Sequence, residues 1–113
     1  MKQKQMRTLY VGVVLVSLFT VRASPARAQS VAETLFKTKC AACHGPDGKG
    51  EVPMGKKLAV PSLSAPEVQN QSDVQLTDAI GKGKNKMPAY DGKLSKEQIA
   101  GLVAYIRELG KKH

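Results

Sequence analysis

Hydrophobic positions are most regular near the end of the chain. Five apolar residues recur there at intervals of one, three or four, which is the pattern of an amphipathic helix: Ile99, Leu102, Val103, Ile106 and Leu109. Ser95 precedes this run, and Gln98 stands three residues after Ser95, which is the spacing of an N-terminal capping box. The pattern therefore predicts a helix that begins after Ser95, ends at Gly110 and buries one face.

A first helix is predicted over about residues 31 to 43. Leu35 and Phe36 supply its apolar face, and Ala32 lies one turn before Phe36. The turn-forming cluster Gly45-Pro46-Asp47-Gly48 follows directly. We therefore expect this helix to end before that cluster.

A middle helix is predicted over about residues 72 to 80, where Leu76 and Ile80 stand four apart and Gly81 follows. Residues 48–66 contain Gly and Pro without a helical period, so we expect a long irregular loop there. No segment carries a strong strand pattern around these elements. The sequence therefore predicts an all-α domain of three to four helices.

The N-terminus has the pattern of a secretory signal peptide. Lys2, Lys4 and Arg7 precede thirteen uncharged residues, 9–21, and Ala26-Arg27-Ala28 matches a cleavage motif. The uncharged run is short for a membrane span, and no cysteine stands at the cleavage point to carry a lipid. We expect the signal segment, residues 1–28, to be removed; an uncleaved anchor is the alternative.

Removal of the signal segment changes both the size and the charge of the protein. Residues 29–113 form a domain of 85 residues, and domains of this size usually need a disulfide, a metal or another cross-link to be stable. The full chain has a net charge of +9, but the signal segment holds five basic residues and no acid, which leaves about +4. Such a modest charge does not indicate a nucleic-acid partner.

The most specific chemistry lies in Cys40-Ala41-Ala42-Cys43-His44, which reads C-x-x-C-H, the attachment motif of a c-type haem. Positions three and four apart share one face of a helix. Both thiols can therefore form thioether bonds to the haem vinyl groups, and His44 can reach the iron. A covalently bound haem would also stabilise the small domain.

Other uses of this motif fit less well. A zinc site normally needs four ligands, and the chain offers one further histidine, His113, and no further cysteine. A thioredoxin-like redox pair needs a βαβ context. A disulfide that closes so short a loop would constrain little of the unfolded chain.

The sixth iron ligand decides what such a haem does. Met87 is the best candidate, because it lies 43 residues after His44 in a Gly- and Lys-rich loop and is followed by Pro88. Met54, the lysines and His113 are the other candidates. Methionine also fills cores, but this polar loop is a poor place for a core residue. A thioether ligand favours Fe(II) and gives an electron carrier, whereas an open position permits gas binding or peroxide chemistry.

The loop at residues 48–66 contains two further candidates. An iron-bound histidine usually donates its second ring N–H to a carbonyl or carboxylate, and the Pro61 carbonyl is a candidate acceptor for His44. Leu63 is a candidate for packing against the haem. The alternative is that Pro61 and Leu63 are ordinary turn and core residues.

The mature chain resembles a small class I c-type cytochrome of the soluble bacterial mono-haem type. The resemblance rests on the C-x-x-C-H motif, on Lys86-Met87-Pro88 and on Leu102-Val103-Ala104-Tyr105-Ile106. It implies the class I cytochrome c fold, wrapped round one covalent haem c with its iron, in which the first and last helices cross beside the haem. Ala32 and Phe36 would contact Leu102 and Tyr105 there, and the family more often has Gly in place of Ala32.

The resemblance also implies a function. It points to an exported electron carrier, and not to an enzyme, that exchanges electrons with redox protein partners. The haem would be attached in the periplasm or an equivalent compartment. We expect a monomer without a stable membrane insertion after cleavage. A basic rim at Lys56, Lys57, Lys82, Lys84 and Lys86 would attract acidic docking surfaces, unless these are simply solvated loop lysines. The alternatives are a haem-based sensor with a displaceable sixth ligand and a membrane-tethered module of a larger redox complex.

Overall fold

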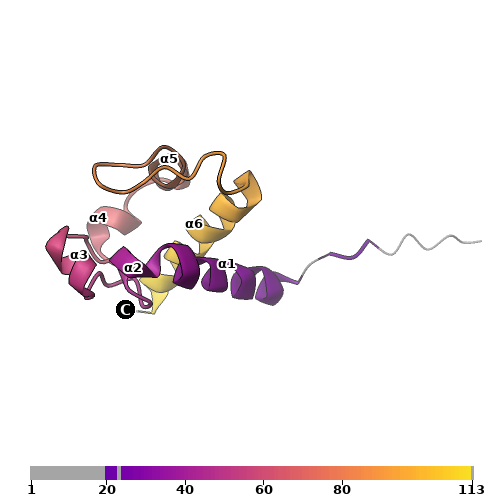
Figure 1. The fold of residues 1–113 in the computed structure, drawn as a ribbon. Helices are drawn as coiled ribbons and strands as arrows, with labels where there is room; N and C mark the ends of the chain where they lie inside the picture. Colours follow the sequence, from indigo (N-terminus) through magenta and orange to yellow (C-terminus); the bar gives the residue numbers. More distant parts are fainter. Residues whose placement is uncertain (1–19, 23, 113) are drawn as a thin grey trace, which may run out of the picture.

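The computed structural model describes residues 20–22 and 24–112, and in this part of the chain it contains six helices and no strands (Figure 1). The helices are α1 (Pro25–Lys39), α2 (Ala41–His44), α3 (Pro53–Lys57), α4 (Pro66–Gln69), α5 (Asp73–Lys82) and α6 (Lys96–Lys111). The all-α prediction is confirmed, but three to four helices was too few. The additional elements are short, since α2, α3 and α4 each make about one turn.

Most of the expected signal segment cannot be compared with the structure. Lys2, Lys4, Arg7 and nearly all of the uncharged run lie outside the described residues, as does His113. Within the described residues, no helix combines the length and the apolar character that a membrane crossing requires.

Helix α6 forms as the sequence pattern predicts. Ser95 and Gln98 make both bonds of the capping box: the Gln98 N–H donates to the Ser95 hydroxyl at 3.0 Å, and the Ser95 N–H donates to Gln98 Oε1 at 2.8 Å. All five residues of the predicted apolar face are buried, together with Tyr105. The predicted end at Gly110 is wrong by one residue, because Gly110 is helical and its missing side chain leaves room for the side chain of Gln69.

Helix α1 begins earlier than predicted. Ser24 caps it and Pro25 occupies its first turn, so the helix includes the expected cleavage motif, Ala26-Arg27-Ala28. A proline suits the first helical turn because its missing N–H would have no partner there. The predicted start near residue 31 is therefore six residues late. At the other end, Cys40 separates α1 from α2.

The first and last helices cross, as expected (Figure 1). The rings of Phe36 and Tyr105 lie 5.1 Å apart at the crossing, with 52° between their planes. Ala32 is buried and faces Gly101, where an added Cβ would stand 3.6 Å from the Ala32 methyl group. This is an ordinary van der Waals separation, so the crossing has room for the Ala32 methyl group.

Helix α5 has a second capping box, made by Ser72 and Gln75. Leu76 and Ile80 are buried, as predicted. The helix continues two residues past the expected end and stops at Gly83, which has a φ of +75°. Glycine favours this left-handed backbone because it has no Cβ.

Arg107 fixes the segment that follows the predicted irregular loop. Its guanidinium donates to the Gln69 carbonyl at 2.7 Å and to the Asp73 carboxylate at 3.0 Å. The Gln69 amide donates in turn to the Leu63 carbonyl at 2.6 Å. These long-range bonds fix α4 and the start of α5 on α6. No local sequence pattern would have predicted them.

Candidate functional site

Helix α2 carries the C-x-x-C-H motif as a single turn. The Cys43 and His44 N–H groups donate to the Cys40 carbonyl, at 3.3 and 3.0 Å. Gly45, with a φ of +77°, ends the turn. Cys40 and Cys43 are half-buried and free, so neither thiol is consumed by a disulfide. The backbone therefore presents both thiols and the imidazole from one turn, as thioether attachment of a haem requires.

Burial shifts the pKa values of two side chains at this turn, Cys40 and His44. Burial raises the pKa of the Cys40 thiol to about 11, which keeps it protonated and uncharged. Burial lowers the pKa of His44, which favours the neutral imidazole that binds metals. The His44 side chain is therefore held in the form that can ligate a metal.

His44 Nδ1 is buried and has no hydrogen-bond partner among the described residues. The expected bond from His44 to the Pro61 carbonyl is therefore not formed in this structure. Pro61 is exposed, whereas Leu63 is buried in the core and its N–H donates to the Gly48 carbonyl at 2.8 Å. Residue order alone suggested the Pro61 carbonyl as an acceptor but could not establish the contact.

Two glycines that the motif does not reveal support the α2 turn. The Gly50 N–H donates to the His44 carbonyl at 2.7 Å. Gly55 of α3 is buried against α2, and an added Cβ would overlap the carbonyl oxygens of Gly50 and Cys43. Helix α3 can approach the haem-attachment turn only because residue 55 has no side chain. No sequence pattern around Gly55 signals this contact.

Replacing Gly55 by Ala is expected to lower the free energy of unfolding by about 1–3 kcal/mol, the usual cost of overpacking. The new methyl group must push α3 away from the carbonyl of Cys43. Thermal unfolding of the haem-loaded protein measures the loss. Gly101→Ala is the matched control, because its Cβ would make only an ordinary 3.6 Å contact with Ala32. Equal stability of the two variants would contradict the close α2–α3 contact.

Met87 lies in the loop between α5 and α6. It is half-buried and packs against the core. Two backbone bonds close a turn at this point: the Met87 N–H donates to the Lys84 carbonyl at 2.9 Å, and the Lys84 N–H donates to the Met87 carbonyl at 3.2 Å. Asn85 takes a left-handed φ of +54° within the turn. The other candidate, Met54 on α3, is 45% exposed.

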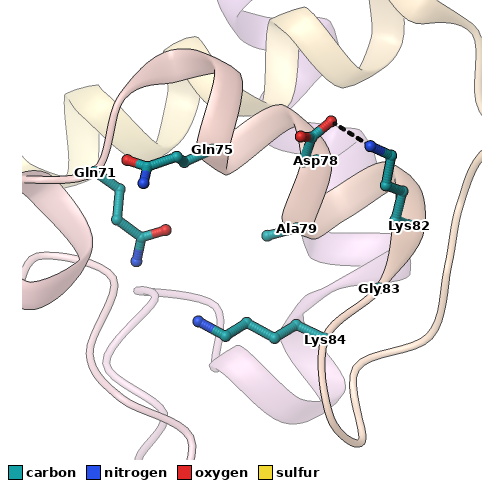
Figure 2. A pocket seen from close by; sticks show the side chains of 7 residues that line it. All are labelled: Gln71, Gln75, Asp78, Ala79, Lys82, Gly83 and Lys84. Carbon is teal, nitrogen blue, oxygen red and sulfur yellow. Dashed lines mark ion pairs between the residues drawn. The ribbon is translucent and has the colours of Figure 1, made fainter.

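A hollow of about 300 Å³ lies beside this loop (Figure 2). It is lined by Gln71, Gln75, Asp78, Ala79, Lys82, Gly83 and Lys84. Figure 2 shows the Lys84 side chain extending along one edge of the hollow, while Lys82 turns away toward Asp78. The Lys82 ammonium pairs with the Asp78 carboxylate at 3.4 Å, so Lys82 contributes less unpaired charge than the predicted basic rim assumed.

The remaining lysines of that predicted rim are exposed. Lys56 and Lys57 lie at the end of α3, and Lys84 and Lys86 flank the Met87 turn. Among the residues that the structure describes, none of these four lysines takes part in an ion pair. Their charges are therefore available to a partner.

Comparison with known proteins gives a consistent result. The family model described as cytochrome C oxidase, cbb3-type, subunit III matches residues 27–106. Cytochrome c6 of Synechococcus sp. is 34% identical, over 96% of this chain and 97% of its own length. The cbb3-type cytochrome c oxidase subunit FixP of Bradyrhizobium diazoefficiens is 32% identical over 69% of this chain, but over only 26% of its own length. A solved c-type cytochrome, KustC0563, aligns with a TM-score of 0.64 and 28% identity, over 69% of this chain and 95% of its own.

Proposed function

Because the chain belongs to the small class I c-type cytochromes, we propose that it is an exported electron carrier whose single haem c is held by Cys40 and Cys43 and ligated by His44 and Met87. The α2 turn is the observation that carries this proposal, since it presents two free thiols together with a half-buried imidazole, whose Nδ1 atom is buried and has no hydrogen-bond partner among the described residues. An electron carrier transforms no substrate, so no catalytic acid, base or nucleophile is required.

When bound, the haem supplies one-electron chemistry at its iron. Cys40 and Cys43 would fix the haem covalently, and His44 would ligate the iron through its neutral imidazole. Met87 would supply a further ligand to the iron through its thioether sulfur. Its soft thioether would favour the reduced iron and raise the reduction potential. The burial of the neighbouring core residues, including Leu63, would limit water around the site.

The surroundings of Met87 support its assignment as a ligand. A turn closed at both ends holds the residue half-buried at the edge of the core. Met54 is the other described methionine of the mature chain, and it is more exposed on a one-turn helix. A ligand must be held in place through each electron transfer, which the closed Met87 turn provides.

The signal segment is the basis for proposing export. Residues 29–113 would then form the mature domain in the periplasm or an equivalent compartment. Cleavage after Ala28 would remove Ser24 and Pro25, which start α1 in the full chain. Ser30 stands three residues before Glu33, the spacing of a capping box, so a new helix start is available in the mature chain. The mature helix would then begin near the residue that the hydrophobic pattern predicted.

We further propose that the carrier is a monomer that meets acidic redox proteins at a basic rim made by Lys56, Lys57, Lys84 and Lys86. Opposite charges steer the encounter and raise the association rate more than the affinity. This steering weakens as salt screens the charges.

Replacing Lys84 and Lys86 by Gln is therefore expected to slow electron transfer to an acidic redox partner several-fold at low salt, and to flatten its salt dependence. Stopped-flow absorbance measures both quantities. The control replaces Lys96 and Lys112, at the two ends of α6, by Gln; both are exposed and neither takes part in an ion pair among the described residues, so the same charge is removed from another surface. Equal slowing by both double variants would show that the net charge of the protein, and not the position of the rim lysines, sets the rate of electron transfer.

Mass and visible spectra of the purified protein test the function itself. We expect the mass of residues 29–113 plus one haem, a Met–iron charge-transfer band in the ferric state, and no reaction of the ferrous state with carbon monoxide. Rapid carbon monoxide binding would indicate a ligand-binding haem protein instead. A mass that retains residues 1–28 would indicate a tethered module.

A further inference from the structure

The loop that carries Met87 is closed on itself. Gly83 packs against the other limb of the loop, where an added Cβ would stand 2.6 Å from the Met87 carbonyl oxygen. At the far end, the Tyr90 N–H donates to the carbonyls of Ile80 and Gly81, at 3.1 and 3.0 Å. Both ends of the loop are therefore fixed to the last turn of α5 (Figure 1).

One side-chain bond connects this loop to the haem-attachment side of the molecule. The Tyr90 hydroxyl donates to the Lys39 carbonyl at 3.2 Å, across 51 residues of sequence. Lys39 is the last residue of α1 and directly precedes Cys40. The last carbonyls of a helix have no partner within it, so the phenol supplies one. Among the described residues, no other hydrogen bond joins residues 83–90 to residues 39–44.

The protonation of Tyr90 agrees with this position. Burial is the main reason that the pKa of Tyr90 is raised, and the charged forms of the nearby Cys40 and Cys43 would raise it further. The phenol therefore lies close to both attachment cysteines and stays protonated, so it can donate its hydroxyl hydrogen. Once the thiols become thioethers, burial alone still favours the protonated phenol.

We propose that Tyr90 is a positioning residue: its hydroxyl latches the Met87 loop to the chain just before Cys40 and so sets how readily Met87 leaves the iron. The inference rests on the proposed ligation by His44 and Met87. Displacing Met87 requires the loop to move away from the α2 side, and that movement breaks the bond from Tyr90 to Lys39. Tyr90 itself does not ligate the iron in this scheme.

Tyr90→Phe tests the latch in the haem-loaded ferric protein, with imidazole as the displacing ligand. The loss of the Met–iron band after mixing reports the exchange. We expect the exchange to be about three- to fivefold faster and imidazole to bind about three- to fivefold more tightly, the effect of losing one partly exposed neutral hydrogen bond. The band without imidazole and the global unfolding midpoint should stay close to those of the parent protein.

Tyr105→Phe is the matched control, since no hydrogen bond from the Tyr105 hydroxyl is found in the described part of the chain. It should exchange at the parental rate. Parental exchange in Tyr90→Phe, or equal acceleration in both variants, overturns the latch. Acceleration that merely follows a lower unfolding midpoint overturns it as well. If Met87→Ala keeps the Met–iron band, the ligand assignment fails, and that outcome is distinct from failure of the latch alone.

Discussion

Met87→Ala is expected to abolish the Met–iron charge-transfer band and to lower the reduction potential by on the order of 0.1 V, a fraction of the range that axial ligands span. The thioether stabilises Fe(II) relative to Fe(III), so its loss favours the oxidised state. The emptied position should also let the ferrous protein bind carbon monoxide. Visible spectra and a redox titration of the haem-loaded variant measure these three effects.

Met54→Ala is the matched control for this experiment. It removes the same side chain from α3, where Met54 is 45% exposed. We expect its band, potential and carbon monoxide response to equal those of the parent protein. Loss of the band in Met54→Ala, with its retention in Met87→Ala, would move the ligand from the α5–α6 loop to α3.

Local signals predicted the longest well-patterned elements. The capping box of Ser95 lies at the start of its own helix, and the apolar faces of α5 and α6 repeat at the helical period. The C-x-x-C-H turn could be predicted for the same reason, because its three reactive side chains lie within five consecutive residues. Local spacing alone places such groups on one helical turn.

The short helices and the supports of the site depend on distant contacts, which local patterns do not contain. Helix α4 is fixed by Arg107, 38 residues beyond Gln69. Helix α3 lies close to α2 because Gly55 leaves room for a carbonyl of Cys43. The expected His44–Pro61 bond also depended on a contact between separate segments of the chain, and it is not formed in this structure.

The start of α1 could not be predicted from the sequence for a different reason. Two start signals compete in the full chain, Ser24 with Pro25 and Ser30 with Glu33. The structure uses the first, whereas the predicted processing would leave only the second. A hydrophobic pattern cannot choose between them, because residues 26–31 are exposed and bury no apolar face.

Phe36→Ala is expected to lower the free energy of unfolding by about 3–5 kcal/mol, the usual cost of emptying a buried phenylalanine site. The Phe36 side chain is 1% exposed, and its ring lies 5.1 Å from that of Tyr105 and 6.4 Å from that of His44. It therefore joins the crossing of α1 and α6 to His44, the proposed iron ligand. For a domain of this size, each 1 kcal/mol shifts the melting temperature by roughly 4–8 °C, so the fall should exceed about 12 °C.

Thermal unfolding of the haem-loaded protein, followed at the haem band and in the far-ultraviolet, measures this loss. Phe36→Leu should lose less, because the leucine refills part of the site. Val74→Ala is the surface control, since Val74 on α5 is 70% exposed and its truncation should change the stability by no more than about 0.5 kcal/mol. If Phe36→Ala behaves like Val74→Ala, then the covalent haem and not the helix crossing holds α1 in place, and stability would depend on attachment at Cys40 and Cys43 alone.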